Sequence, residues 1–172
     1  MEKAKRKFIR KICLLGDGGV GKTSLVRRFV YDFFGDEYLT SFGTKVTKKV
    51  IDFDEAELTL MIWDILGQKT HQALHHAYYK GANGALLVCD LTREETVKNL
   101  VGWRNDFIEV VGDVPILPIA NKSDLECKVK ESLLREIESI IGHKFVRTSA
   151  KTGEGVQNAF SKLGRAMLEV CD

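Results

Sequence analysis

Runs of apolar residues along this chain alternate with stretches in which apolar side chains recur every three or four positions. The first pattern is typical of buried strands, and the second is typical of helices with one face in a core. The apolar runs predict strands at residues 8–15, 46–53, 57–64, 85–89, 114–120 and 144–147. The helical spacing predicts one helix that begins near residue 22 and others at residues 97–111, 133–141 and 156–170.

The order of these elements predicts the fold class. Residues 54–56 form a short link between two strands and indicate an antiparallel hairpin. Helices separate the remaining strands, and right-handed β-α-β crossovers join such strands in parallel. We therefore expect an α/β domain whose six-stranded, mostly parallel sheet has one antiparallel edge strand and helices on both faces. Ligands of such sheets bind at the carboxyl ends of the strands.

Composition predicts one compact domain in a reducing compartment. The chain has 172 residues, of which 44% are hydrophobic and 29% are charged, which is enough for one core. No apolar run approaches membrane-spanning length, and the amino terminus lacks the apolar stretch of a signal peptide. The four cysteines have no metal-ligand spacing and two lie in apolar runs, so we expect buried free thiols.

The net charge of +2 is distributed unevenly along the chain. Residues 1–11 hold six basic residues and one acidic residue, so the remaining 161 residues carry a net charge of −3. We interpret residues 1–7 as a basic arm and residues 8–172 as the domain. A basic arm attracts anionic lipid or nucleic acid, but a solvated terminus explains it more simply. No nucleic-acid partner is expected.

A glycine-rich segment between the first strand and the first helix matches the phosphate-binding pattern G-x-x-x-x-G-K-[ST]. Its glycines let successive backbone N–H groups turn inward at a helix N-terminus, which makes an anion-binding site. Lys22 is expected to reach the β- and γ-phosphates, and the Thr23 hydroxyl is expected to bind Mg²⁺. The residues expected to contact the nucleotide here are Asp17, Gly18, Gly19, Val20, Gly21, Lys22, Thr23 and Ser24.

A second motif, Asn121-Lys122-Ser123-Asp124, follows the fifth predicted strand and selects the base. The Asp124 carboxylate can accept two parallel hydrogen bonds from guanine, whereas adenine would leave it unpaired. Lys122 is expected to lie along the ring face, and Asn121 is expected to join neighbouring loops. A backbone N–H after the last strand can meet guanine O6, and the residues expected there are Ser149, Ala150 and Lys151.

Together these motifs resemble the Ras superfamily of small GTPases over residues 8–170, with details most similar to the Rab branch. The resemblance implies the P-loop NTPase fold and a switch that hydrolyses GTP to GDP. It also implies further site residues by their distance from Lys22. Phe34, twelve residues later, would stack on the base, and Ser41, nineteen residues later, would bind Mg²⁺. Gly67 would bind the γ-phosphate, and Gln68 would orient the attacking water.

The resemblance also implies a mechanism and partners. Mg²⁺ would be held by Thr23 and Ser41, and by Asp64 through water, while Lys22, Ser41 and Gln68 would serve catalysis. Bound GTP orders two loops that relax after hydrolysis. No arginine lies in an obvious position to neutralise the transition state, so turnover should be slow and stimulated by a partner. The implied partners are effectors, an exchange factor and a GTPase-activating protein, with roles in signalling or vesicle trafficking. A monomer is expected.

Three positions depart from the family pattern. Ser41 replaces the usual threonine, Leu66 places a bulky group close to the γ-phosphate, and Lys69 reverses a charge beside Gln68. These changes bear on loop closure and hydrolysis. The alternative function is therefore a GTP-binding interaction module without hydrolysis, either alone or as the G domain of a larger protein. Asp124 disfavours an adenine-nucleotide enzyme.

Two groups of side chains are open to two interpretations. Trp63 and Tyr78, with Val46, match an aromatic effector-binding patch of the Rab branch, or they are ordinary packing on the sheet. Three histidines, His71, His75 and His76, follow the segment that contains Gly67 and Gln68. A metal cluster formed by them would lack an evident fourth ligand, so we expect them to lie on a solvated face instead.

The two ends of the sequence carry no recognisable lipid-attachment signal. Residues 169–172 fit neither a C-a-a-X box nor a terminal cysteine pair, and Glu2 excludes N-myristoylation. We expect either a soluble protein or a tail that lies beyond this sequence. The basic arm is too little for stable anchoring by itself. The expected location is the cytoplasm, with peripheral association at a membrane surface as the alternative.

Overall fold

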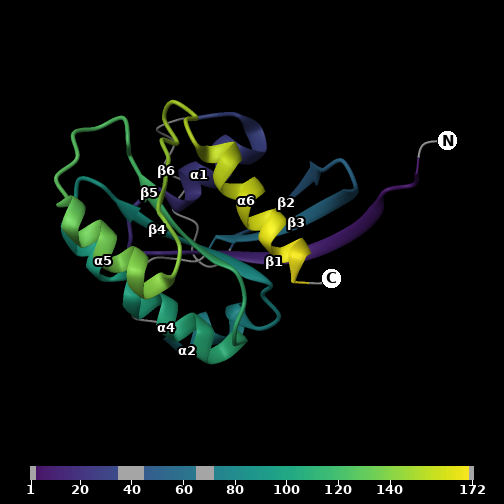
Figure 1. The fold of residues 1–172 in the computed structure, drawn as a ribbon, viewed down its shortest axis with the longest axis horizontal. Helices are drawn as coiled ribbons and strands as arrows, with labels where there is room; N and C mark the ends of the chain where they lie inside the picture. The colour runs from purple at the N-terminus through teal and green to yellow at the C-terminus, as the bar shows by residue number, and fades with distance from the viewer. Residues whose placement is uncertain (1–2, 35–44, 65–71, 171–172) are drawn as a thin grey trace.

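A computed structural model describes residues 3–34, 45–64 and 72–170 of the chain. Within these residues the strands are β1 (Arg6–Leu15), β2 (Lys45–Asp52), β3 (Ala56–Asp64), β4 (Gly84–Asp90), β5 (Ile116–Asn121) and β6 (Val146–Arg147). The helices are α1 (Lys22–Tyr31), α2 (Gln72–Tyr79), α3 (Glu94–Lys98), α4 (Leu100–Val111), α5 (Glu131–Ile141) and α6 (Val156–Glu169). Figure 1 shows these elements along the chain.

The six strands form one sheet in the order β2-β3-β1-β4-β5-β6. β2 pairs antiparallel with β3, and every other neighbouring pair is parallel. The predicted α/β class is confirmed, with a six-stranded, mostly parallel sheet and one antiparallel edge strand. Because these pairs are parallel, the carboxyl ends of β1, β3, β4, β5 and β6 lie at the same edge of the sheet.

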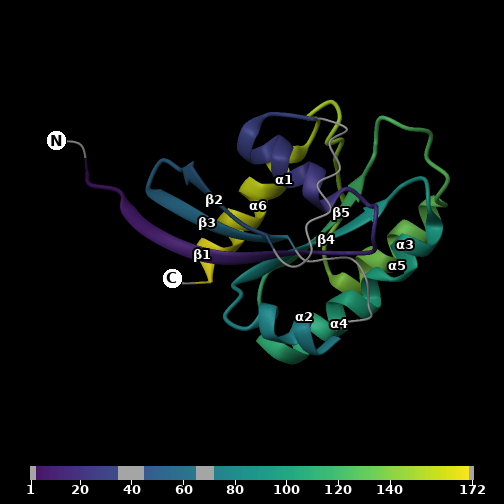
Figure 2. The same cartoon turned by 180° about the vertical axis from the view of Figure 1, so that it is seen from behind.

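Helices cover both faces of the sheet, and the alternation of side chains along β1 builds both cores. Ile12 and Leu14 belong to one apolar cluster, which also contains residues of α1 and α6. Cys13 and Leu15 belong to the other, which contains residues of α2, α3, α4 and α5. Figures 1 and 2 show α1 and α6 on one side of the sheet and α2, α4 and α5 on the other. The predicted helices on both faces are confirmed.

Aromatic side chains hold each helical layer together. The rings of Phe29 in α1 and Phe160 in α6 are stacked with their centroids 4.0 Å apart. On the opposite face, the ring of Tyr79 in α2 packs edge-on against Phe107 in α4, with centroids 5.2 Å apart. These contacts place the helices at fixed positions relative to the sheet edge that carries the loops.

Several boundaries differ from the sequence prediction. The helix predicted at residues 97–111 begins earlier and is divided into α3 and α4, which meet at Asn99. The Asn99 backbone keeps right-handed helical angles, and its side chain is bonded outside the helix. The last strand is shorter than predicted. Ile140 of α5 is exposed, and the helix predicted at residues 156–170 ends at Glu169, which leaves Val170 exposed beyond it.

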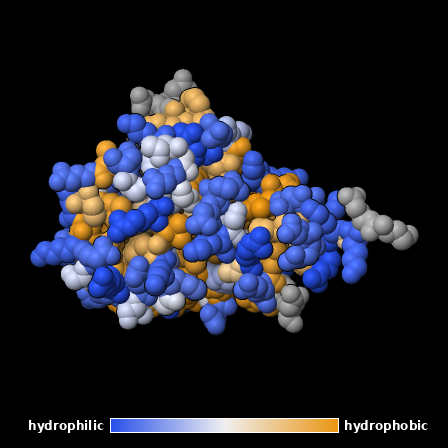
Figure 3. Space-filling view, turned by 45° about the horizontal axis from the view of Figure 1, so that its top comes forward, coloured by the Kyte–Doolittle hydropathy of each residue, from blue (hydrophilic) through white to orange (hydrophobic). Residues whose placement is uncertain are grey.

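Two of the described cysteines are buried and one is exposed. Cys13 and Cys89 are buried free thiols, and burial raises the pKa of Cys13 to about 12. Cys127 is exposed, so the prediction of a buried thiol is wrong at this position. The face in Figure 3 is mostly hydrophilic, with small apolar areas. Among the described helices, none combines the length and apolar character needed to cross a membrane.

Candidate functional site

The phosphate-binding loop connects β1 to α1, and its shape depends on glycine. The backbone of Gly21 is in the left-handed region at φ 103, and a Cβ there would lie 2.4 Å from the Asn121 side-chain nitrogen. At Gly16, a Cβ would lie 2.2 Å from the Val88 carbonyl oxygen. α1 begins with no side-chain cap, so the backbone N–H groups of its first turn remain for an anion.

Lys22 lies at the centre of this loop. Its buried Nζ donates to the carbonyl oxygens of Gly16, at 2.7 Å, and Asp17, at 3.0 Å. Burial lowers the pKa of Lys22 to about 8, although the carboxylates of Asp64 and Asp17 oppose this shift; Arg93 adds to it. The loop therefore holds an ammonium group, poorly solvated by water, beside the N-terminus of α1, where a phosphate would contact both.

Oxygen ligands for a divalent cation meet beside Lys22. The Thr23 hydroxyl donates to the carboxylate of Asp64 with an oxygen–oxygen distance of 2.5 Å. Asp64 is buried at the carboxyl end of β3. A hydroxyl and a carboxylate next to a phosphate loop are the donor set that Mg²⁺ takes in such sites, so these residues fit the ion. Ser41, the third predicted ligand, lies outside the described residues.

Asn121 joins the phosphate loop to the base-reading segment, as the sequence predicts. Its side-chain nitrogen donates to the carbonyl oxygen of Val20 at 2.9 Å. Its side-chain oxygen accepts a hydrogen bond from the Thr148 hydroxyl, also at 2.9 Å. The Asn121 and Thr148 side chains are buried, so both bonds are protected from water. Three loops that are far apart in the sequence are thereby held together.

Asp124 and Ser149 lie side by side at the sheet edge. The Ser149 hydroxyl donates to Asp124 Oδ1 at 2.7 Å, and the backbone N–H of Ser123 donates to Thr148 O at 3.0 Å. The Asp124 residue is exposed, so its carboxylate can accept bonds from a ligand. Lys122, with φ 65, is in the left-handed region, and its Nζ lies 2.9 Å from Asp90.

The backbone of the last loop is fixed from α1. Arg28 donates from Nε to the carbonyl oxygen of Ala150 at 2.8 Å, and from Nη2 to that of Lys151 at 2.6 Å. These bonds use the carbonyl oxygens, so the backbone N–H groups that the sequence assigns to guanine O6 are not the groups that Arg28 contacts.

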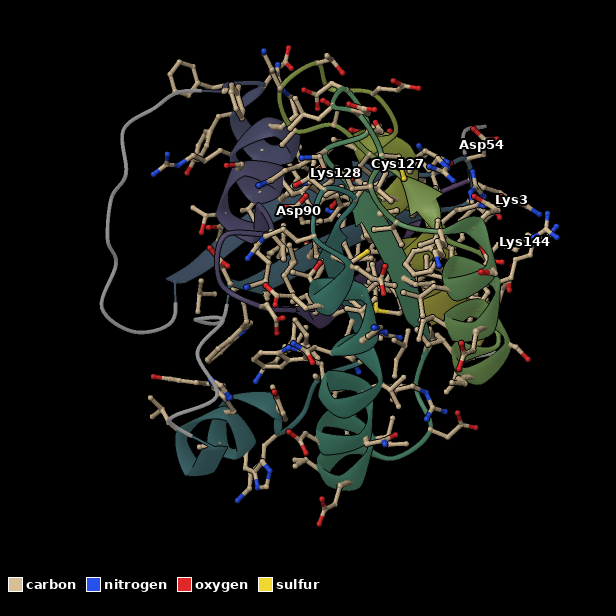
Figure 4. All side chains as sticks on the ribbon, turned by 90° about the vertical axis from the view of Figure 1, so that its left-hand side faces the viewer. Lys3, Asp54, Asp90, Cys127, Lys128 and Lys144 are labelled. Atoms are coloured by element: carbon tan, nitrogen blue, oxygen red, sulfur yellow. The ribbon has the colours of Figure 1, made fainter. Side chains whose placement is uncertain are left out.

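Sequence reasoning missed Asp90, a buried carboxylate at the end of β4. It accepts hydrogen bonds from Thr92 and Arg93 and an ion pair from Lys122. Burial by itself raises the pKa of Asp90, but these bonds outweigh burial and hold the pKa below its usual value. Figure 4 shows Asp90 near the segment that carries Cys127 and Lys128. The only sequence signal for Asp90 was its position as an acidic residue at the end of a predicted central strand.

Arg93 was also missed. Its Nη2 donates to the carbonyl oxygen of Gly18 at 2.9 Å, while its Nε donates to Asp90 at 3.1 Å. These bonds attach Arg93 to the backbone of the phosphate loop; that no arginine of the chain neutralises the transition state stays a prediction. Arg93 is 75 residues from Gly18 in the sequence, and only the packing of the sheet edge brings the two together.

Asp17 contributes to the loop in a different way from its neighbours. Its two carboxylate oxygens accept hydrogen bonds from Asn99 Nδ2, at 2.7 Å, and Trp103 Nε1, at 2.9 Å. The side chain is thus bonded to Trp103 of α4 and to Asn99, which immediately precedes α4. The Asp17 carboxylate is therefore already paired, and the Asp17 carbonyl oxygen accepts from Lys22.

Several predicted site residues lie outside the described residues. Phe34, by contrast, lies within the described residues, three residues after the end of α1, and is exposed. The predictions that remain outside the described ranges concern Ser41, Leu66, Gly67, Gln68 and Lys69.

The histidines of α2 differ from the expectation. His75 is buried, and its ring lies 5.5 Å from that of Trp103, centroid to centroid, so a solvated face is the wrong description of this residue. α2 packs its His75 side against α4, which the sequence pattern of α2 did not indicate. No group of three metal-ligating side chains is found within residues 3–34, 45–64 and 72–170. His71 lies outside them.

Val46, Trp63 and Tyr78 are neighbours, as the sequence suggested. Val46 pairs with Trp63 across β2 and β3, and the rings of Trp63 and Tyr78 are 5.7 Å apart. Lys11 lies over the Trp63 ring, with Nζ 3.9 Å from its centroid. Val46 is 43% exposed, and Trp63 and Tyr78 pack partly against the core, so the cluster combines packing with exposed surface.

Comparison with known proteins identifies relatives along most of the chain. A family model described as the Ras family matches residues 11–169. The chain is 36% identical to the Ras-related protein Rab-13 of Canis lupus familiaris, over 92% of this chain and 79% of the relative. It is 36% identical to the Ras-related protein SEC4 of Saccharomyces cerevisiae, over 95% and 77%. It is also 36% identical to human Rab-8B, over 94% and 79%.

Replacing Gly21 tests the close approach of Asn121 to the phosphate loop. In Gly21→Ala the new Cβ meets the Asn121 amide and requires strained backbone angles. We expect GDP affinity to fall at least about tenfold, which corresponds to roughly 1.4 kcal/mol of binding free energy. Gly142→Ala is the matched control, because Gly142 also has a positive φ, at 84, but a Cβ there meets nothing within 4 Å. Equal losses in the two variants, measured by titration with a fluorescent GDP, would contradict this account.

The lowered pKa of Lys22 predicts a pH-dependent stability in the nucleotide-free protein. The pKa of Lys22 is about 8 in the folded protein, whereas the ordinary pKa of a lysine side chain is 10.5. Between these values the unfolded chain binds more protons, so the free energy of unfolding should rise with pH relative to Lys22→Met. Below pH 8 the free energies of unfolding of the two proteins should change with pH in the same way. Urea unfolding of both proteins from pH 7 to pH 10.5 measures the difference between their free energies of unfolding. If these free energies depend on pH in the same way over the whole range, the lowered pKa of Lys22 is refuted.

Proposed function

Because the chain belongs to the Ras family and is a GTP-binding molecular switch that hydrolyses GTP, we propose roles for the residues at this sheet edge. Lys22 and the N-terminus of α1 bind the phosphates, and Asp124 binds guanine. The observation that carries the proposal is the pair of hydrogen bonds made by Asn121. They hold the phosphate loop and the base-reading segment at one fixed separation, as a single nucleotide requires.

The phosphate end of the site provides charge and backbone donors. Lys22 carries a fixed positive charge to the β- and γ-phosphates, and the N–H groups of residues 18–24 bind their oxygens. Thr23, Asp64 and Ser41 would hold Mg²⁺, Asp64 acting through a water molecule. When bound, the ion neutralises charge on the phosphate oxygens. Burial of Lys22 and Asp64 excludes water from this part of the site and strengthens their electrostatic interactions.

The base end of the site provides selectivity. The Asp124 carboxylate accepts from guanine N1–H and the exocyclic amine, and Ser149 orients the carboxylate through its hydroxyl. A backbone N–H among Ser149, Ala150 and Lys151 meets guanine O6. The stem of Lys122 lies along the ring face while its Nζ stays paired with Asp90. Phe34 packs on the other side of the base.

We assign hydrolysis and regulation to the segment that precedes β2 and to the segment that follows β3. We propose that Gln68 orients the attacking water, and that Gly67 and Ser41 bind the γ-phosphate and the ion. The proposed partners are effectors, an exchange factor and a GTPase-activating protein that supplies an arginine. We further propose a monomer whose G domain follows a basic arm; because β1 begins at Arg6 and pairs with β3 from that residue, we place Arg6 and Lys7 in the domain. A cytoplasmic location with peripheral membrane association fits its family. A hydrolysing switch is favoured over a non-hydrolysing module.

The nucleotide retained on purification tests the proposal first. We expect guanine nucleotide, followed by slow single-turnover phosphate release that stops when EDTA removes the metal ion. Retention of adenine nucleotide would contradict the role of Asp124. Guanine binding without phosphate release, even in Leu66→Ala, would contradict the catalytic roles and support the non-hydrolysing module.

Asp124→Asn tests the base-reading carboxylate directly. The new amide can donate to the carbonyl of xanthine but pairs poorly with the two guanine donors, and its oxygen still accepts from Ser149. We expect affinity for GDP to fall by roughly a hundredfold and affinity for xanthosine diphosphate to rise. Leu125→Ala, at an exposed neighbouring position, should leave both affinities unchanged. Undiminished GDP affinity in Asp124→Asn, measured by competition titration, would rule out Asp124 as the base reader.

A further inference from the structure

The phosphate loop is tied to α4 through the side chain of Asp17. One carboxylate oxygen accepts from Asn99 and the other accepts from the indole N–H of Trp103. An indole has a single hydrogen-bond donor and no acceptor. Hydrogen bonds weaken steeply as their angle departs from linearity. A small rotation of the Trp103 ring therefore weakens this bond to the phosphate loop, with no other group on the ring to replace it.

The opposite side of Trp103 faces α2. Trp103 is 2% exposed, and the ring of His75 lies 5.5 Å from it at an angle of 41°. His75 also lies 6.2 Å from Tyr79, and the Tyr79 ring packs edge-on against Phe107. These four side chains, His75, Tyr79, Trp103 and Phe107, form the α2–α4 aromatic cluster. The contact between the two helices thus runs directly to the group that bonds Asp17.

Two polar groups of α2 are buried in or beside this cluster. The Tyr79 hydroxyl and His76 Nε2 are buried without a hydrogen-bond partner among the described residues. Unpaired donors and acceptors are costly in a core. A hydrogen bond from either of these two groups to α4 would fix one position of α2 on α4. The contact of α2 with Trp103 is made by the His75 ring.

We propose that Trp103 is a positioning residue that couples the position of α2 to the phosphate loop through Asp17. His75 is the residue of α2 that acts on the Trp103 ring. α2 follows the segment to which the proposed function assigns Gly67 and Gln68, so the inference rests on that assignment. Nucleotide-dependent movement of α2 changes the environment of Trp103 and the strength of its bond to Asp17. The phosphate loop in turn holds GDP more or less firmly according to the position of α2.

Tryptophan emission tests the coupling. The chain has two tryptophans, so Trp63→Phe leaves Trp103 as the reporter. We expect its emission to change when GDP is exchanged for a non-hydrolysable GTP analogue. His75→Ala in the Trp63→Phe background should reduce this change at least by half. Leu74→Ala, on the exposed side of the same helix, should retain it. Unchanged emission, or an undiminished change in His75→Ala, would overturn the proposal.

Release of GDP provides the second measurement. Trp103→Phe keeps an aromatic ring but removes the donor to Asp17, so we expect GDP release to become about tenfold faster. His75→Ala alone should accelerate release about threefold, and its effect should fall below about twofold in the Trp103→Phe background, because coupled residues are not additive. Independent, multiplying effects would overturn the coupling. If His75→Ala fails to fold by circular dichroism, His75→Gln takes its place in both measurements.

The two measurements separate this inference from the proposed function. A Trp63→Phe protein that retains guanine nucleotide and hydrolyses it, yet shows no change in Trp103 emission, refutes the coupling alone. A protein that retains no guanine nucleotide refutes the assignment of the site on which the coupling rests.

Discussion

The side-chain amide of Asn121 is the contact on which the rest of the site depends. Its nitrogen and its oxygen bond two different loops, so both are held at the separation of one amide group. This approach is possible because Gly21 has no Cβ, which would lie 2.4 Å from the amide nitrogen. The phosphate loop and the base-reading segment thereby keep one relative position without a ligand. Preorganisation of this kind reduces the cost of ordering the site when nucleotide binds.

The charges of the site are arranged by buried carboxylates. Asp90 accepts bonds from Arg93, which also donates to the Gly18 carbonyl of the phosphate loop, and from Lys122 of the base-reading segment. Asp64 lies next to Thr23 in the same region. A buried carboxylate is tolerated only where its oxygens are paired, and here the pairing places positive charge beside the phosphate loop.

The two helical layers serve the site differently. α1 and α6 meet through a stack of two phenylalanine rings, an apolar contact that holds α1 against α6. α2 and α4 meet through rings that include His75 and Trp103, and Trp103 is bonded to Asp17. The ring contact between α1 and α6 is apolar. The contact between α2 and α4 includes a polar path from a helix to the loop that carries Lys22.

The sequence alone determined the order of the elements, the hairpin, the parallel sheet and the two nucleotide motifs, because hydrophobic periodicity and glycine spacing are local properties of the chain. Only the tertiary structure decided which distant polar groups meet. Arg93 is 75 residues from Gly18, and Trp103 is 86 residues from Asp17, so neither pairing has a local signal. His75 is polar and adjacent to another histidine, which suggested a solvated face. The packing of α2 on α4 buries it, since burial depends on the neighbouring helix as well as on the residue itself.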